Sequence, residues 1–430
     1  MDIYKMKTIY ALASAHGTAG VSIIRISGNK SSQIAKAITH KANFEPRYAY
    51  FAEIHSEDEI IDSAIVIYFK APNSFTGEDS VEIQCHGSRA VLQKIYELLE
   101  TFDDVRPAKR GEFTERAVEN NKLDLVQAEG LLDLVHAKTE AQRKQAIAIK
   151  TGKLSHVYTN WRKKLLELLT LIEADIDFSE EPLPLEIEKQ ITEKTSWLID
   201  AIATNLENPK GTLIRDGISI AIIGKPNAGK STLFNFLVGK NASIISSIPG
   251  TTRDIVEATI DIKGYEICFA DTAGLRETAD TIEKEGVRRA LEKAENADIK
   301  ILVSTNENSK IDEKTILVLN KSDEKKYKNS ENAFVISAKN GNGIPALSDE
   351  IEKKILDLVA GKEEIGYANA RHFHYLKKAK NDLEKSLSAT QTDLKAEHIL
   401  YASNFLGELL GEIKTEEILK NIFSNFCIGK

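Results

Sequence analysis

The segment GKPNAGKST, at residues 224–232, combines residue types and spacing that bind nucleotide phosphates. It follows an apolar run at 218–223 and precedes a helical apolar pattern, which is the strand–loop–helix context of a P-loop. Glycines in such a loop turn backbone amides toward phosphate oxygens, and the helix N-terminus adds partial positive charge. Lys230 is expected to neutralise the terminal phosphates and Ser231 to ligate Mg²⁺. The sequence therefore predicts a nucleoside triphosphate site.

Two downstream motifs narrow this nucleotide to GTP. DTAG closes a second apolar run, where Asp271 can hold Mg²⁺ through water and the amide of Gly274 can sense the last phosphate. NKSD ends a third apolar run with Asp323, whose ionised carboxylate only accepts hydrogen bonds. Guanine presents two adjacent donors, N1–H and the 2-amino group, which adenine lacks. Asp323 is therefore predicted to select guanine.

Further residues complete the predicted GTP site. Ser337, Ala338 and Lys339 follow another apolar run and suit a loop behind the base, and Thr252 of PGTTRD suits a switch residue that binds Mg²⁺. The predicted GTP contacts are Asn227, Ala228, Gly229, Lys230, Ser231, Thr232, Ser246, Ser247, Ile248, Pro249, Gly250, Thr251, Thr252, Asp271, Thr272, Ala273, Gly274, Asn320, Lys321, Asp323, Ser337, Ala338 and Lys339.

Length and composition bound the class of protein. The 430 residues suggest about three domains, and the 42% apolar fraction suffices for sizeable cores. Three cysteines without a CxxC pattern indicate a reducing, cytoplasmic location and argue against disulfides or structural zinc. A net charge of −8 means that a nucleic acid would need a local basic patch. No apolar run reaches the roughly 18 residues of a transmembrane helix, so no membrane span is predicted.

The chain is predicted to fold as several domains. Residues 1–119 alternate strand-like and helical runs and are expected to form an α/β domain. Residues 120–213 and 363–430 show helical periodicity and are expected to form one discontinuous α-helical domain. Residues 214–362 alternate strands and helices, as in a doubly wound, mostly parallel sheet. This P-loop domain is therefore predicted to be inserted in the helical domain, and NPKG at 208–211 is predicted to be a linker.

GTP hydrolysis needs a residue that orients the attacking water, and many GTPases use a glutamine directly after DTAG. That position is Leu275, so Glu283, a short loop further on in TIEKEG, is the candidate; a solvated helix position is the competing interpretation. The transition state also needs positive charge, and no arginine finger is evident. A monovalent cation held by the side-chain amide oxygen of Asn227 is a candidate replacement.

Several motifs together resemble one family closely. NSFTGED (73–79), GEFTERA (111–117), NKLDLVQAE (121–129), GKPNAGKST, PGTTRD, DTAGLRET and the terminal CIGK are similar to the MnmE (TrmE) family of tRNA modification GTPases, in the TrmE-Era-EngA-like group. The resemblance covers nearly the whole chain. It implies a bacterial or organellar type of enzyme that works with a FAD-dependent partner, MnmG (GidA). Together they are expected to install a carboxymethylaminomethyl or aminomethyl group on C5 of the tRNA wobble uridine.

The resemblance also implies a folate site and a homodimer. In this family a tetrahydrofolate derivative, 5-formyl- or methylene-tetrahydrofolate, supplies the one-carbon unit, and the N-terminal domain mediates dimerisation. The folate contacts of the family match Arg25, Glu82, Lys122 and Lys430. Arg25 and the lysines can meet the carboxylates of the glutamate tail, and Glu82 can accept from the pterin edge. An exposed position on an alternating strand is the competing interpretation of Glu82.

In this family the GTPase domains pair across the nucleotide in a potassium-dependent way, and K⁺ replaces the arginine finger. The matching positions imply K⁺ ligands at Asn227, Ser246, Ile248 and Thr251, Mg²⁺ ligands at Ser231 and Thr252, and a water-positioning role for Glu283. The switch region, residues 243–254, is expected to order when the last phosphate and the ion are bound.

The terminal motif and three departures from the family pattern leave alternatives open. Cys427 belongs to a terminal motif needed for modification in the family, and it is either a nucleophile or a structural element. SAHGTAG at 14–20, CHGSRA at 85–90 and Arg110, where a proline usually precedes GEF, all differ from the family and bear on folate affinity.

A GTP switch of the Era type, without modifying activity, is the alternative function. Such factors share the P-loop, DTAG and NKxD motifs, and they usually add an RNA-binding module after the GTPase domain. Here the tail is an amphipathic helical segment without a KH-like GxxG loop in a strand context, which favours the modifying enzyme.

Overall fold

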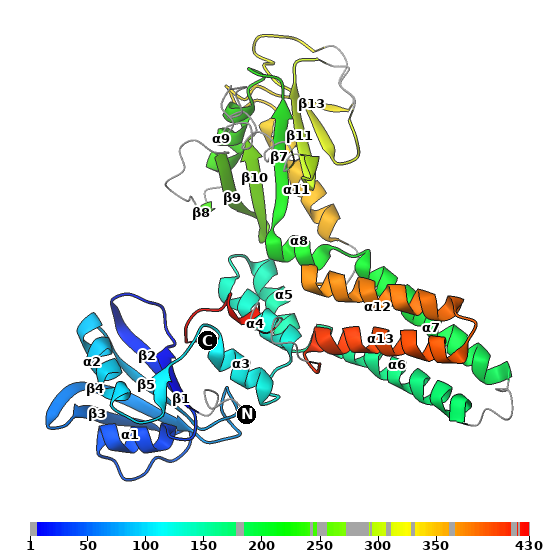
Figure 1. The fold of residues 1–430 in the computed structure, drawn as a ribbon. Coiled ribbons are helices and arrows are strands. Elements are labelled where there is room, and N and C mark those ends of the chain that lie inside the picture. The colour runs from blue at the N-terminus through cyan, green and yellow to red at the C-terminus, as the bar shows by residue number, and fades with distance from the viewer. Residues whose placement is uncertain are drawn as a thin grey trace, which may run out of the picture. The chain divides into compact units, whose positions relative to one another are not determined.

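The computed structural model describes residues 7–177, 185–240, 244–246, 256–271, 292, 295–306, 311–327, 332–360, 366–413, 419 and 422–429 (Figure 1). The chain divides into two compact units: Met1–Leu132 with Lys150–Arg162 and Leu406–Lys430, and Asp133–Ile149 with Lys163–Phe405. Within the described ranges, no helix is long and apolar enough to cross a membrane.

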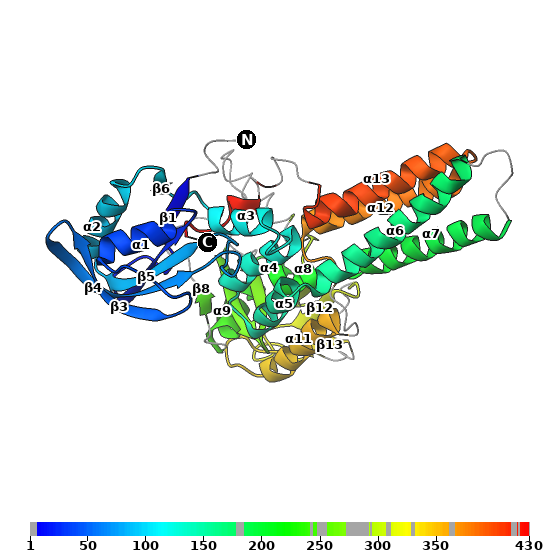
Figure 2. The same cartoon turned by 90° about the horizontal axis from the view of Figure 1, so that it is seen from below.

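The first unit is built on a six-stranded sheet. Its strands are β1 (Thr8–Leu12), β2 (Ala19–Ser27), β3 (Ala49–Ser56), β4 (Glu59–Phe69), β5 (Ser80–Gly87) and β6 (Val105–Pro107). Their order is β3-β4-β5-β2-β1-β6, and the β1–β6 pair is parallel while the others are antiparallel. Helices α1 (Ser31–Thr39) and α2 (Arg89–Glu100) cover one face, over a core that includes Ile24, Ile26 and Ile83 (Figure 2).

The opposite face of this sheet is only partly covered. Helix α3 (Glu112–Glu119) places Phe113 against Ile9 and Ala11 of β1. Farther along the same face, the cross-strand partners Phe51 and Ile65 are 73% and 39% exposed. Successive residues of a strand point to opposite faces, so this face combines a small core at one end with exposed apolar side chains at the other.

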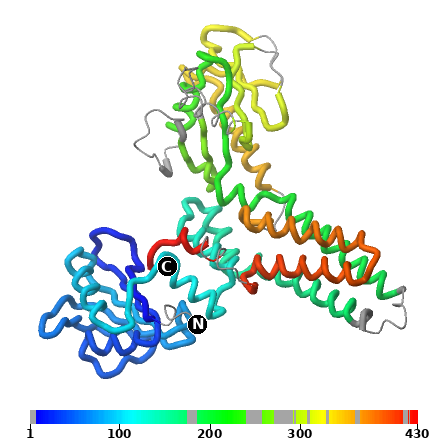
Figure 3. The backbone as a smooth tube through the Cα atoms, in the orientation of Figure 1, coloured from blue at the N-terminus to red at the C-terminus, as the bar shows by residue number. Residues whose placement is uncertain are grey.

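Helical segments that are distant in sequence lie side by side. The long helices are α4 (Leu125–His136), α5 (Glu140–Lys150), α6 (Lys153–Asp177), α7 (Leu185–Leu206), α12 (Ala370–Ser388) and α13 (Thr392–Leu410). Within the second unit, α7 packs against α12, although the whole P-loop domain separates them in the chain (Figure 3). An inserted α/β domain between two helical segments is the predicted fold class, and it is confirmed.

The P-loop domain has a seven-stranded sheet in the second unit. The strands are β7 (Ile218–Gly224), β8 (Ile244–Ser246), β9 (Val256–Ile262), β10 (Tyr265–Asp271), β11 (Ile299–Ser304), β12 (Thr315–Leu319) and β13 (Ala333–Val335). The order is β13-β12-β11-β7-β10-β9-β8, parallel from β13 to β10 and antiparallel at β9. Helices α9 (Lys230–Lys240) and α11 (Ile344–Val359) contribute to one core with Ile218, Ile220 and Ile222.

The predicted linker at 208–211 is wrong in part. Helix α8 (Lys210–Asp216) begins inside NPKG and leads directly into β7. Pro209 lies at its N-cap, where a residue without a backbone N–H costs no helical hydrogen bond. The Pro–Gly signal therefore marks a helix start rather than a flexible connection.

The start of β10 is bound to α5 by buried hydrogen bonds. The Glu266 carboxylate is 7% exposed and accepts from Lys138 Nζ at 2.8 Å and from Gln142 Nε2 at 2.6 Å. The backbone N–H of Ala141 donates to the carbonyl of Gly264 at 3.1 Å. Because β10 ends at Asp271 of DTAG, α5 holds the strand that carries the predicted magnesium motif.

Candidate functional site

The P-loop lies between the end of β7 and the start of α9. Its backbone includes residues with positive φ, which residues other than glycine rarely adopt. Gly224 and Gly229 have φ of +148° and +94°, and a Cβ at Gly229 would overlap the side-chain amide of Asn320. Lys230 is 7% exposed, and its Nζ donates to the carbonyls of Gly224 at 2.9 Å and Lys225 at 3.1 Å. The P-loop therefore holds the Lys230 ammonium group beside the backbone that is predicted to surround the phosphates.

Asn320 joins the P-loop to the loop after β13. Its side chain is 3% exposed; Nδ2 donates to the carbonyl of Ala228 at 2.8 Å, and Oδ1 accepts from the N–H of Ala338 at 2.9 Å. Asn320 belongs to the NKSD motif, but the motif alone does not predict this connection. One amide thus fixes the phosphate loop and the predicted base loop relative to each other.

Asp323 is held in the geometry of a base-recognition group. Its Oδ1 accepts from Ser337 Oγ at 2.8 Å, and the carboxylate is exposed at the surface. The Ser337 hydrogen bond, followed by smaller effects that include the charges of Lys339 and Lys321, lowers the pKa of Asp323. The carboxylate is therefore ionised at neutral pH and can only accept hydrogen bonds, as guanine selection requires.

The structure brings most described members of the predicted GTP site to one edge of the sheet. Ser231 and Thr232 are exposed in the first turn of α9, and Asp271 ends β10 opposite Ile222 of β7. Ser246 ends β8. The following predicted residues lie outside the described residues: Ser247, Ile248, Pro249, Gly250, Thr251, Thr252, Thr272, Ala273, Gly274, Glu283 and Lys430.

Arg25 and Glu82, two of the predicted folate residues, form an ion pair on neighbouring strands. They are register partners on β2 and β5, and Arg25 Nε and Nη2 donate to Glu82 Oε1 at 3.0 and 2.9 Å. The Arg25 guanidinium also lies 5.3 Å from the ring centroid of Phe75 and 5.8 Å from that of Phe113. The two rings were not predicted as site residues, although both belong to the motifs NSFTGED and GEFTERA.

Lys122 lies at the rim of the same unit. Its Nζ donates to the carbonyl of Pro72 at 3.0 Å, and a Cβ at Gly77 would lie 3.3 Å from Lys122 Cγ. Pro72 directly precedes the NSFTGED segment, and Gly77 lies within it together with Phe75. The segment therefore contacts both predicted basic residues, Lys122 and Arg25.

The C-terminal segment lies across the first unit beside these residues. The N–H of Gly111 donates to the carbonyl of Cys427 at 3.4 Å, and Arg110 forms a bridge with Ile428. A Cβ at Gly429 would overlap the carbonyl oxygen of Leu12, at the end of β1, so only glycine fits there. The Cys427 thiol is exposed and its backbone is tied to the start of α3.

A buried network of charges supports α3. Glu112 is 6% exposed and accepts from Arg106 Nη2 at 2.6 Å, Arg116 Nη2 at 3.1 Å and the N–H of Lys109 at 2.8 Å. Burial opposes ionisation of Glu112, but these bonds and the two guanidinium charges together lower its pKa. The ionised Glu112 therefore contributes stability where Phe113 meets Arg25.

Replacing Glu112 with glutamine is expected to speed the hydrogen–deuterium exchange of the backbone amides of α3. Leaving two guanidinium groups near an uncharged partner should cost about 3 kcal/mol of local stability. Because the pKa of Glu112 is lowered in the folded state, its contribution is present above its ordinary pKa of about 4.3 and is lost as pH falls through the folded value. Hydrogen–deuterium exchange of the Glu112–Glu119 amides should therefore differ between variant and wild type at pH 7.

The control is hydrogen–deuterium exchange of α3 in a variant that neutralises an exposed carboxylate on α2. Glu97→Gln should leave exchange of α3 unchanged at every pH, because Glu97 is a surface residue of another helix. Equal protection of α3 in Glu112→Gln and wild type at pH 7 would contradict a stabilising role for the network.

A mostly parallel sheet with a P-loop, which a buried asparagine joins to the predicted base loop beside a carboxylate suited to guanine, defines a P-loop GTP-binding protein. Family comparison matches residues 8–122 to the GTP-binding protein TrmE N-terminus and residues 125–427 to the MnmE helical domain. The tRNA modification GTPase MnmE of Rickettsia bellii (strain OSU 85-389) is 45% identical over 99% of this chain and 100% of its own. That of Rickettsia typhi is 42% identical over the same shares. The chain belongs to the MnmE family of tRNA modification GTPases.

Membership in this family confirms the resemblance of the motifs, and the chain is a GTP hydrolase that acts in tRNA modification. Solved structures match a smaller part. The G domain of the T. maritima FeoB iron transporter is 28% identical and covers 33% of this chain and 99% of its own, with a TM-score of 0.25. The assignment rests on the full-length relatives.

Proposed function

We propose that this chain is a potassium-dependent GTPase that works with a FAD-dependent MnmG (GidA) in the cytoplasm. Together they install a (carboxymethyl)aminomethyl group on C5 of the tRNA wobble uridine, with a tetrahydrofolate derivative as one-carbon donor and Mg²⁺ bound with GTP. Domains at 1–119, at 120–213 with 363–430, and at 214–362 belong to the same proposal.

One observation carries the modifying role: the terminal segment lies beside the predicted folate residues in one compact unit. Cys427 is tied through its carbonyl to Gly111, two residues before Phe113, whose ring faces Arg25. Arg25 pairs with Glu82 and fixes the orientation of the carboxylate that is suited to the pterin edge. A GTP switch without modifying activity has no need for this arrangement.

The partly covered sheet face supports the proposed homodimer. Phe51 and Ile65 are cross-strand partners on β3 and β4, and both are exposed on a face that otherwise carries α3. Adjacent exposed apolar side chains on a sheet are typical of an interface. A second copy of the N-terminal domain, as in the family, would bury them.

Modified nucleosides test the proposal as a whole. Mass spectrometry of tRNA nucleosides from cells with and without this chain should show loss of C5-aminomethyl-type uridines without it. Wild type should restore them, and a deletion of residues 427–430 should not. An unchanged nucleoside profile would remove the modifying role and leave an Era-type GTP switch as the better account.

Removing the side chain of Asn227 is expected to abolish potassium stimulation of GTP hydrolysis. Asn227 is exposed in the P-loop with φ of +62°, where its amide oxygen suits a monovalent cation and where alanine is strained. Asn227→Gly keeps this backbone conformation accessible, so both Asn227→Ala and Asn227→Gly should lose the difference in turnover between K⁺ and Na⁺ buffers. Normal potassium stimulation in Asn227→Gly would rule out the proposed ligand.

Replacing Glu283 with alanine is expected to lower GTP turnover by about 10², the scale of a group that positions water or transfers a proton. GTP affinity should remain close to that of wild type, because Glu283 is assigned to the attacking water and not to the nucleotide. Single-turnover hydrolysis and equilibrium binding separate the two effects. Loss of binding with unchanged single-turnover rate would make Glu283 a structural residue.

A further inference from the structure

Helix α12 carries a surplus of positive charge in an acidic chain. Its residues include five Lys or Arg and two Asp or Glu, whereas the whole chain has a net charge of −8. The basic residues are Arg371, Lys377, Lys378, Lys380 and Lys385, and the acidic residues are Asp382 and Glu384. An acidic protein that binds an RNA needs such a local surplus, because its overall field repels phosphates.

Six of the exposed side chains of α12 form a stripe, which we call the α12 basic face. It consists of His374, Lys377, Lys378, Asn381, Lys385 and Ser388, all exposed. Their spacing repeats every three or four residues, so they lie on one side of the helix over about 20 Å. The buried side of α12, with Leu376, Ala379 and Leu383, packs into the second unit. The face is therefore presented on a rigid element and is bordered by one exposed carboxylate, that of Glu384.

Two lysines of this face have ammonium groups that no carboxylate among the described residues neutralises. Among the described residues, neither Lys377 nor Lys378 forms an ion pair; Lys378 Nζ lies 5.8 Å from the ring centroid of Tyr375 and 5.3 Å from that of Phe405. Aromatic contact orients the Lys378 stem without neutralising its ammonium group. The Glu384 carboxylate, which lies nearby on α12, is paired with Lys380 at 2.6 Å.

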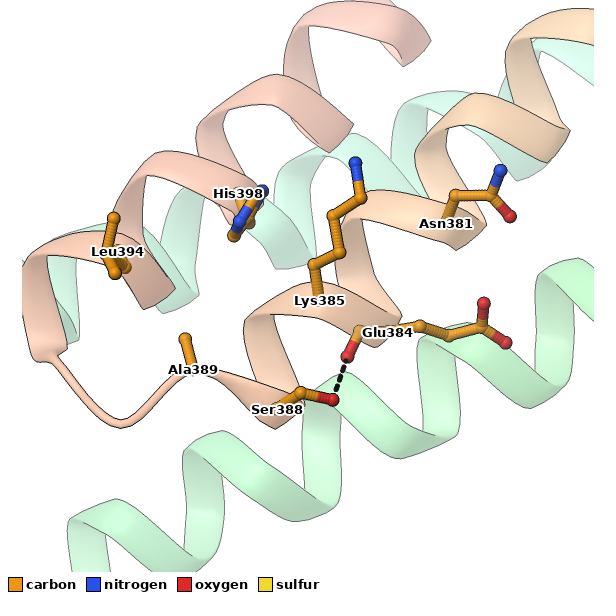
Figure 4. Close-up of a pocket in the computed structure, with 7 residues that line it drawn as sticks. All are labelled: Asn381, Glu384, Lys385, Ser388, Ala389, Leu394 and His398. Atoms are coloured by element: carbon orange, nitrogen blue, oxygen red, sulfur yellow. Dashed lines mark hydrogen bonds between the residues drawn. The ribbon is translucent and has the colours of Figure 1, made fainter.

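The C-terminal end of the α12 basic face adjoins a groove at the turn between α12 and α13. The groove has a volume of about 560 Å³ and is lined by Asn381, Glu384, Lys385, Ser388, Ala389, Leu394 and His398. Figure 4 shows Asn381 and Lys385 rising from α12 on the same side, with His398 contributed by α13. Lys385 Nζ and His398 Nδ1 both contact Asp382 Oδ1, at 3.2 and 3.0 Å.

These groups match the chemistry of a sugar–phosphate backbone. Lysine ammonium groups contact phosphate oxygens, and the Asn381 amide can meet a phosphate or a ribose 2′-hydroxyl. The Ser388 hydroxyl donates to the carbonyl of Glu384 at 3.0 Å and keeps a lone pair to accept from a 2′-hydroxyl (Figure 4). A stripe of about 20 Å is long enough to span several phosphates.

We propose that the α12 basic face and the adjoining groove bind the sugar–phosphate backbone of the tRNA substrate. The inference rests on membership in a tRNA modification family and adds the surface that holds the RNA. Backbone contact of this kind is independent of sequence, so it positions the tRNA, and the choice of uridine is made elsewhere.

Charge reversal on this face tests the proposal with the full chain. The probe is fluorescently labelled unmodified tRNA, and its affinity is measured by anisotropy over a series of salt concentrations. Lys377→Glu with Lys378→Glu should weaken binding at least 10-fold and lower the salt dependence by about two phosphate contacts. Lys377→Gln with Lys378→Gln keeps side-chain length, and should give a smaller loss of affinity in the same direction.

An adjacent lysine pair on another helix serves as the matched control. Lys353→Glu with Lys354→Glu on α11 changes the net charge equally and should alter tRNA affinity less than 2-fold. GTP hydrolysis without tRNA should be unchanged in all three variants, which separates this proposal from the GTPase itself. Unchanged tRNA affinity in both α12 variants would overturn the proposal, and loss of uridine modification at unchanged affinity would assign the face to a protein partner instead.

Discussion

Replacing Asp323 with asparagine is expected to shift nucleotide preference from GTP toward xanthosine triphosphate by about 10³-fold. The carboxylate accepts from two donors of guanine, N1–H and the 2-amino group, and leaving such groups unpaired in a polar site costs several kcal/mol. Asparagine offers one acceptor and one donor. Xanthine carries an oxygen where guanine carries the 2-amino group, so the asparagine N–H regains a partner there.

The geometry around Asp323 should let the variant change its base preference without a change in the conformation of the loop. Ser337 Oγ holds Oδ1 of Asp323 at 2.8 Å and can also hold an amide oxygen, so the loop should keep its conformation in the variant. Because the pKa of Asp323 is lowered, mainly by Ser337, wild-type GTP affinity should not change between pH 5 and 8 through this group. Competition assays with GTP and xanthosine triphosphate give the preference directly.

Glu324→Gln is the control for Asp323→Asn. Glu324 is the next carboxylate in the chain and is exposed, so its neutralisation should leave both affinities within 2-fold of wild type. Equal weakening of GTP and xanthosine triphosphate by Asp323→Asn would mean that Asp323 maintains the loop and does not read the base.

Local sequence signals were sufficient where each segment carries its own pattern. The helix at Ser31–Thr39 is one of the helical runs expected in residues 1–119, because its apolar residues Ile34, Ala35 and Ile38 repeat at helical spacing. The apolar runs before DTAG and NKSD are strands β10 and β12, since continuous apolar runs identify strands buried on both faces. The P-loop, the base-recognition motif and the family were predictable because each is identified by a short, local run of residues.

Features that depend on distant partners were not predictable. Helix α3 begins after Gly111 at φ of +68° and is supported by Arg106 and by Phe113 packing on β1, none of which a helical pattern reveals. Strand β3 buries only Ala52 and Ile54, and it is defined by its antiparallel pairing with β4. The contact of Gly429 with Leu12 joins the two ends of the chain, and only the folded unit shows it.

Asn320 is the clearest case of such a long-range contact, and removing it is expected to have the largest effect on nucleotide affinity. Asn320→Ala deletes the bonds to Ala228 and Ala338 and leaves a carbonyl and an N–H unpaired, at 5% and 4% residue exposure. Each unpaired buried group costs about 1–3 kcal/mol. The P-loop and the base loop should then lose their mutual positions, and affinity should fall by about 10³-fold.

The affinities of GDP and GTP distinguish this role from a contact with the last phosphate. Asn320 bonds to loops that hold the base and the P-loop, so Asn320→Ala should weaken GDP and GTP by the same factor. Asn340→Ala, at an exposed position of the same loop, should leave both affinities unchanged. Because a Cβ at Gly229 would overlap the Asn320 amide, Gly229→Ala should reproduce the Asn320→Ala defect by displacing the same side chain. Loss of GTP affinity alone would place the Asn320 effect at the last phosphate and contradict a connection between the two loops.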